Sequence, residues 1–379
     1  MCIRDSDEPM WSGGIPGWCD NYGHAEKIWF TANYLKEKSQ IPMWDPNWAC
    51  GYPIYQFYPP LSYLIASIFT ILFDSYEAGY IIAFEGAQLT GGLLIYLFMR
   101  MIIKSKFSAL ISGLYFSLCP FFYYYWVWLG VFPNGFGSMI FLPATFILYE
   151  WARREPLRLK PIFLGGIVFS LAILTHIFVF LICFYSLAFF WISNLLLNIL
   201  ICNKKWTKIR FSFVTLFTIL IAILIAIGLS AFWLLPAFIM RHRMVYFKYV
   251  QMWWEHVNPY KYLSSFYPWL IPLCLSLLFI KTSKVHIPYL MVYIIFLLWS
   301  FGKNSPATWW FFSDLPIIGT VPPKRLLIIV EFFMSVLTGF SLHFISKLSY
   351  RVFRSTQKNI SPINRLTQST KRMILVFLA

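Results

Sequence analysis

Residues 162–200 read IFLGGIVFSLAILTHIFVFLICFYSLAFFWISNLLLNIL and contain no charged side chain. An α-helix crosses the hydrocarbon core of a bilayer with about twenty apolar residues, and this stretch is roughly twice that length. It predicts two membrane-spanning helices joined by a tight turn, because backbone groups in lipid must be hydrogen-bonded within the protein. His176, in the sequence LTHIF, lies where this turn is expected.

The rest of the chain has the same apolar character. Hydrophobic residues make up 59% of the 379 residues and charged residues only 12%, which is too little charge to cover a water-soluble protein of this length. Further apolar runs lie at residues 78–100, 106–122, 137–151, 211–235, 263–280, 286–301 and 326–346. The predicted fold is all-α, a polytopic transmembrane helix bundle with about nine full spans.

The basic residues predict how this bundle is oriented. The net charge of +16 comes mostly from short clusters between apolar runs, so membrane lipid is an expected partner and nucleic acid is not. Loops rich in Lys and Arg stay in the cytoplasm, which places there Arg100, Lys104 and Lys106; Arg153, Arg154, Arg158 and Lys160; Lys204, Lys205, Lys208 and Arg210; and Lys281 and Lys284. Residues 7–60, the turn at His176, residues 237–262 and residues 302–325 then lie outside the cytoplasm.

The chain divides into segments of different character. Residues 1–6, MCIRDS, resemble a translated adapter sequence and are excluded from fold reasoning. We expect an extracytoplasmic loop with short helices at 7–60, and an interfacial or re-entrant helix at 61–73, which is apolar but short for a span. The transmembrane bundle follows at 74–346, a basic cytoplasmic segment at 347–372, and the start of a truncated span at 373–379.

Within the first loop, residues 20–38 predict a helix. Ile28, Ala32 and Leu35 recur at helical spacing, and Lys36 and Lys38 lie in the last turn. Asp20 can cap the start of this helix. Alternatively, Asp20 and His24, four residues apart and near one face, point together at a ligand.

The next stretch, IPMWDPNWACGYPIYQFYPPLSY, contains too many prolines for a helix and predicts an extended loop rich in aromatic residues. Its rings include Trp44, Tyr52 and Tyr58. Such rings either anchor a loop at the lipid headgroups or stack on a sugar or lipid in a groove.

The order of several pieces resembles one known class of membrane enzyme. The Asp20 and His24 pair is followed by IPMWDPNWACGYPIYQFYPPLSYL, LAILTHIF, GLSAFWLLPAF and FGKNSPATWWFFSDLPIIGTVPPKRLLII. Together they resemble the GT-C-class membrane glycosyltransferases. They are similar in particular to the 6-pyruvoyl-tetrahydropterin-synthase-related membrane domain family, although nothing in this chain indicates a soluble pterin enzyme.

The resemblance implies inverting transfer of a sugar from a polyprenyl-phosphate donor to a glycan, lipid or protein acceptor at the outer face of the cell membrane. Asp20 matches the catalytic base, and partial desolvation beside the membrane would raise its pKa and make it a better base. His24 then holds the phosphate, holds a divalent metal ion, or orients Asp20. No motif requires a cofactor, and the metal question stays open.

The departing lipid phosphate needs cations, and Lys324, Arg325, Arg241 and Arg243 are the basic residues expected on the outer side. For Arg325 the alternative is an anchor that reaches the membrane interface at the start of a span. His176 either binds substrate or is only a polar turn residue. Glu85 lies inside a predicted span, where it lines the donor groove or is protonated and hydrogen-bonded to a neighbouring helix.

Two other interpretations remain. A noncatalytic transporter or lipid flippase would need polar residues lining a path to the cytoplasmic side, and the predicted spans show few beyond Glu85 and Glu331. The second alternative is a degenerate scaffold that keeps the fold without catalytic activity. The WWDYG-type motif of oligosaccharyltransferases is absent from the sequence, which puts transfer to asparagine in doubt.

Overall fold

The computed structural model describes residues 20–47, 50–119, 130–201, 206–243, 277, 284–305 and 323–359. Over these residues the all-α expectation is confirmed, and the one β-bridge pairs Asp45 with Tyr52. The helices are α1 (Asn21–Lys38), α2 (Leu61–Phe73), α3 (Tyr76–Ile102), α4 (Lys106–Ser117), α6 (Phe132–Arg154), α7 (Leu159–Thr175), α8 (Ile177–Ile201), α9 (Trp206–Leu229), α10 (Ala231–Ile239), α13 (Ile287–Ser300) and α15 (Leu327–Asn359), with short 3₁₀ turns η3 (Met240–Arg243), η7 (Gly302–Asn304) and η9 (Pro323–Leu326).

The apolar run at 162–200 breaks where the sequence predicts. α7 ends at Thr175, and His176 has extended backbone with φ −168° and ψ 135° before α8 begins. The His176 Nδ1 accepts a hydrogen bond from the Phe178 backbone N–H at 3.1 Å. This N–H is one of the first donors of α8, which have no partner inside the helix, so the imidazole satisfies a group that a break in lipid would otherwise leave unpaired.

Four helical segments among the described residues are long and apolar enough to cross a membrane: Tyr76–Ile102, Ile177–Leu200, Ile209–Leu229 and Pro323–Arg351. The helices Leu61–Phe73, Leu159–Thr175 and Ile287–Ser300 are apolar but shorter. The run at 263–280 lies outside the described residues apart from Leu277. The count of nine spans therefore stays a prediction, as does the placement of α2 at the interface.

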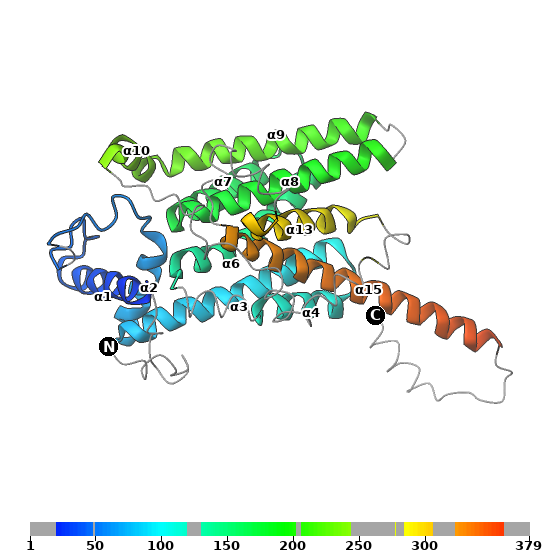
Figure 1. The fold of residues 1–379 in the computed structure, drawn as a ribbon, viewed down its shortest axis with the longest axis horizontal. Helices are drawn as coiled ribbons and strands as arrows, with labels where there is room; N and C mark the ends of the chain where they lie inside the picture. The colour runs from blue at the N-terminus through cyan, green and yellow to red at the C-terminus, as the bar shows by residue number, and fades with distance from the viewer. Residues whose placement is uncertain are drawn as a thin grey trace.

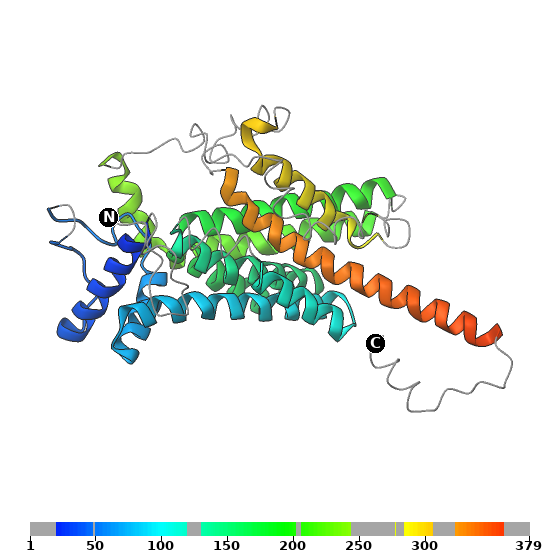
Figure 2. The ribbon, with the colours of Figure 1, turned by 60° about the horizontal axis from the view of Figure 1, so that its bottom comes forward.

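The helix α15 forms the centre of the bundle. In its most apolar stretch 89% of the residues are buried. It packs against α3, α4, α6 and α13 and runs along the bundle in Figures 1 and 2. The fully buried Phe332 contacts the ring of Phe146 at 4.7 Å between centroids. Lipid tails are as apolar as these side chains, so close packing rather than removal from water holds such helices together.

Glycines allow two neighbouring helices to approach closely. A Cβ at Gly113 of α4 would lie 2.5 Å from the Gly92 carbonyl oxygen of α3. Small residues at helix contacts are typical of membrane bundles because they let backbones meet. The fold therefore requires glycine on α4 at this position.

Two predicted spans end differently from the expectation. The run at 211–235 is not one helix, because α9 ends at Leu229 and α10 starts after Ser230. The Ser230 hydroxyl donates to the Ala226 carbonyl at 2.8 Å and contacts the Ser170 hydroxyl of α7 at 2.9 Å. The run at 106–122 gives α4, which ends at Ser117.

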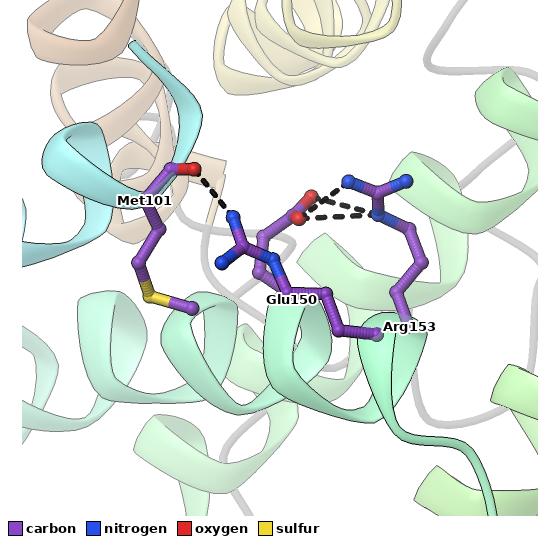
Figure 3. Close-up of polar contacts among 4 residues, drawn as sticks. Met101, Glu150 and Arg153 are labelled. Carbon is purple, nitrogen blue, oxygen red and sulfur yellow. Dashed lines mark hydrogen bonds and ion pairs between the residues drawn. The ribbon is translucent and has the colours of Figure 1, made fainter. Parts of the chain in front are cut away.

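The α3–α4 and α6–α7 connections, the end of α8 and the start of α9 lie at one end of the bundle, and α1, α2 and α10 lie at the other (Figures 1 and 2). Basic clusters of the sequence fall in the α3–α4 and α6–α7 connections and at the start of α9. At the end of α6, Arg153 Nη2 donates to Glu150 Oε2 at 2.7 Å, and Arg154 donates to the Met101 carbonyl at the end of α3 (Figure 3). The Arg154 hydrogen bond thus joins the end of α6 to the end of α3.

Candidate functional site

The helix α1 carries the first two candidate residues. It begins at Asn21 with Asp20 in the N-cap position, as predicted, but the Asp20 side chain makes no capping hydrogen bond. The interpretation of Asp20 as a side-chain cap is therefore wrong. Asp20 is exposed, so the expected desolvation of its carboxylate is not present in this structure.

His24 is buried beneath the start of α1. Its Nδ1 lies 2.7 Å from the Tyr63 hydroxyl of α2, and its ring packs near Tyr58 and Phe132. Burial, together with the charges of Lys27 and Arg325, lowers the pKa of His24 to about 3, although a hydrogen bond to the Gly130 backbone opposes this shift. The imidazole is therefore neutral at physiological pH.

Tyr58 connects this region to the break between α7 and α8. Its ring contacts the buried His176 edge-on, with centroids 5.5 Å apart. Arg325, in η9 before the central helix, places its guanidinium 5.0 Å from the ring centroid of Phe178, next to His176. The structure therefore brings His24, Tyr58, His176 and Arg325 together from four separate parts of the chain, and we call this cluster of packed side chains the polar pocket.

Lys27 is a pocket residue that the sequence analysis did not select. Its ammonium lies 4.4 Å from the ring centroid of Tyr58, 5.4 Å from that of Tyr52 and 5.5 Å from that of Tyr63. Burial lowers the pKa of Lys27 to about 8, although the carboxylates of Glu26, Asp20 and Asp45 oppose this shift. The i, i+4, i+7 spacing of Asp20, His24 and Lys27 on one helix face was the signal that could have identified it.

Gly130 holds the start of α1 against the bundle. Its φ is +62°, and a Cβ there would lie 2.7 Å from the Asn21 nitrogen and 2.8 Å from the Asp20 nitrogen. Both the backbone conformation and the contact require glycine. A second contact joins the start of α1 to α3, because the Asn21 Oδ1 accepts a hydrogen bond from the Tyr80 hydroxyl at 2.7 Å.

Other predicted residues lie outside the polar pocket. Arg241 is exposed on η3, where it donates to the Phe238 carbonyl and covers the Phe238 ring. Glu85 is exposed on α3. Trp44 is 55% exposed and covers Gly51. The side chain of Arg243 lies outside the description.

Two further predicted residues, Tyr52 and Lys324, lie at the border of the polar pocket. Tyr52 borders the pocket through Lys27, and burial raises the pKa of its hydroxyl. Lys324 precedes Arg325 in η9 and is half-buried. Both therefore lie next to the pocket residues.

The chemistry of the pocket suits an anion. Burial raises the pKa of Tyr58 to about 12, while the positive charge of Arg325 partly opposes this shift. The Tyr58 hydroxyl is thus protonated and able to donate, beside two cations and two histidines. No group of three or more His, Cys, Asp or Glu side chains arranged to hold a metal ion occurs within the described part of the chain.

Comparison with known proteins gives the family. No curated protein sequence matches this chain. Among solved structures it is similar to the archaeal oligosaccharyltransferase AglB from Archaeoglobus fulgidus, in complex with an inhibitory peptide and a dolichol-phosphate, with 14% identity and a TM-score of 0.49 over 94% of this chain. The chain spans 50% of that protein's length.

The family model for the 6-pyruvoyl-tetrahydropterin synthase related domain, a membrane protein, matches residues 55–356. This range includes Tyr58, His176 and Arg325, while Asp20 and His24 lie before it. The match confirms the resemblance drawn from the sequence motifs. The chain belongs to the family of membrane proteins with the 6-pyruvoyl-tetrahydropterin synthase related domain.

Proposed function

We propose that this chain is a membrane glycosyltransferase that transfers a sugar from a polyprenyl-phosphate donor to an extracytoplasmic acceptor. The observation that carries the proposal is the polar pocket, where Lys27 and Arg325 both act on Tyr58 beside two buried histidines. Two cations and a phenol hydroxyl at one place are the groups that bind a phosphate. Asp20 precedes this pocket by one helical turn and is exposed to an acceptor from outside.

The reaction follows from these positions. The acceptor hydroxyl attacks the anomeric carbon of the donor sugar while the bond from that carbon to the phosphate oxygen breaks. Asp20 takes the acceptor proton, and polyprenyl phosphate leaves with the bonding electrons. Lys27 and Arg325 stabilise the negative charge that develops on the leaving phosphate.

The membrane orientation of the proposal comes from charge. The basic connections lie at the end of the bundle away from α1, and basic loops are retained in the cytoplasm. The polar pocket would then face outward, next to the outer leaflet. A lipid-linked donor can enter such a site sideways from the bilayer.

The test is sugar transfer by an Asp20→Asn variant in membranes that contain the donor. Loss of a general base lowers the rate by on the order of 10²- to 10⁴-fold. Glu37→Gln removes an exposed carboxylate from the same helix and should transfer at the wild-type rate. Full activity of the Asp20→Asn variant would discard Asp20 as the base, whereas absence of transfer by the wild-type chain as well would favour a scaffold or transporter.

A further inference from the structure

The loop after α1 folds back so that one acidic side chain is enclosed. Asp45 and Tyr52 exchange backbone hydrogen bonds, each 2.8 Å long, and the Trp44 ring covers Gly51, whose φ is +110°. Asp45 is 0% exposed as a result. A carboxylate taken out of water in this way needs partners for its oxygens.

The oxygens of Asp45 are only partly satisfied. Oδ1 accepts the Asn47 backbone N–H at 2.9 Å, whereas Oδ2 is buried and has no hydrogen-bond partner. Glu26 of α1 reaches Asp45 within hydrogen-bonding range. Both Glu26 carboxylate oxygens are likewise buried and without a donor.

The nearest basic residue does not neutralise this pair. The Lys27 ammonium is directed at the Tyr58 ring, 4.4 Å from its centroid. Among the described residues the ion pairs are Lys36 with Asp74 and Arg153 with Glu150, so Lys27 pairs with neither Glu26 nor Asp45. Three carboxylate oxygens from two segments therefore lie close together, and Lys27 acts on them by its charge without forming an ion pair.

We propose that Glu26 and Asp45 form a binding site for a divalent cation with hard oxygen ligands, such as Mg²⁺ or Mn²⁺. Mg²⁺ is usually bound by one or two carboxylates and keeps several waters, so a two-carboxylate site is sufficient. Glu26 supplies both oxygens and Asp45 supplies Oδ2, and the other coordination positions are open to water or to ligand oxygens. Burial, the hydrogen bond with Asp45 and the negative charge of Asp45 raise the pKa of Glu26 to about 8, while the charge of Lys27 opposes them, as expected for two carboxyl groups that share a buried site.

The inference does not rest on sugar transfer, because it concerns ion binding to the chain alone. The probe is Mn²⁺, measured by electron paramagnetic resonance on the purified chain in detergent. We expect one saturable site, and Glu26→Gln and Asp45→Asn should each weaken it by at least about 10- to 100-fold, which is the loss seen even for outer-shell changes. Glu37→Gln and Asp20→Asn should leave it unchanged.

The outcomes separate the alternatives. Absence of saturable Mn²⁺ binding to the wild-type chain would mean that the two carboxyl groups share a proton only, and would overturn the proposal. Undiminished Mn²⁺ binding in Glu26→Gln would overturn the proposal as well. Glutamine has the same shape as glutamate, so this variant stays informative if Asp45→Asn disturbs the loop. Loss of binding in Asp20→Asn would move the ion to the polar pocket and also refute the assignment, whereas loss of transfer with retained Mn²⁺ binding would affect only the proposed function.

Discussion

At the scale of single residues, the polar pocket joins side chains whose ionisation differs from that in water. Neutral His24 and the partly buried Lys27 lie within one α1 segment. The sequence identified His24 by its spacing from Asp20, His176 by its place at the expected turn, and Arg325 as a basic residue on the expected outer side. It did not identify Lys27 or Tyr63, because their roles depend on the way α1 packs on α2.

Lys27 gives phosphate binding a distinct pH dependence. Its pKa of about 8 in the free protein lies below the ordinary 10.5, so its charge is lost as the pH rises through 8. Polyprenyl phosphate affinity should fall by about ten-fold per pH unit above that point, because binding then requires proton uptake. Titration of the wild-type chain at pH 7 and 9 measures this.

A Lys27→Arg variant is the control for that titration. Arginine keeps its charge throughout this range, so its affinity should be flat between pH 7 and 9. An equally flat wild-type profile would show that Lys27 does not contact the phosphate.

The hydrogen bond between Tyr63 and His24 makes a second residue-level prediction. Tyr63→Phe leaves the buried His24 Nδ1 without its partner at 2.7 Å, which costs about 1–3 kcal/mol of stability. The thermal unfolding midpoint in detergent should fall. Tyr22→Phe, at an exposed position, should leave the midpoint unchanged, and an equal fall in both variants would contradict the assignment.

At the scale of helices, periodicity and apolar length located most elements. The helix at 20–38 and the break at His176 are confirmed. The break at Ser230 was missed because the run at 211–235 is continuous in hydropathy. At this break Ser230 contacts Ser170 on another helix, which a local pattern does not contain.

Gly130 allows the docking of α1 to be tested at this scale. Gly130→Ala adds a Cβ within 2.7 Å of the Asn21 nitrogen at a φ of +62°, and the positive φ alone costs about 1 kcal/mol. The variant should shift the start of α1, lower the unfolding temperature and reduce transfer. Gly86→Ala, where nothing lies within 4 Å, is the matched control and should behave as wild type.

At the scale of the whole molecule, the arrangement of basic connections at one end is the basis of the proposed orientation. Charge clusters predicted this sidedness, and alternating helices of the bundle then account for the grouping of the connections at one end. The association of Tyr58 with His176 and Arg325 could not be read from the sequence, because 267 positions separate Tyr58 from Arg325 (325 minus 58). Only the packing of η9 and α8 near the first loop brings them together.

Labelling from outside the cell tests this orientation. Cys50 is exposed in the first loop, and an impermeant maleimide should label it in intact cells. Cys19 lies in the same predicted loop, so the experiment uses a Cys19→Ser chain, in which the signal should disappear on Cys50→Ser. A cysteine substituted at the exposed Lys104 should react only after permeabilisation, and the reverse pattern would invert the proposed topology.

The central claim is that one pocket, assembled from distant segments, holds the donor phosphate. Its most direct test is the affinity of the chain for polyprenyl phosphate in Arg325→Gln and in Arg241→Gln, two arginines of which only the first lies in the pocket. We predict that Arg325→Gln weakens binding by about ten-fold or more, the value of a charge-assisted hydrogen bond, and that Arg241→Gln leaves it unchanged. Equal affinities in the two variants would contradict the account.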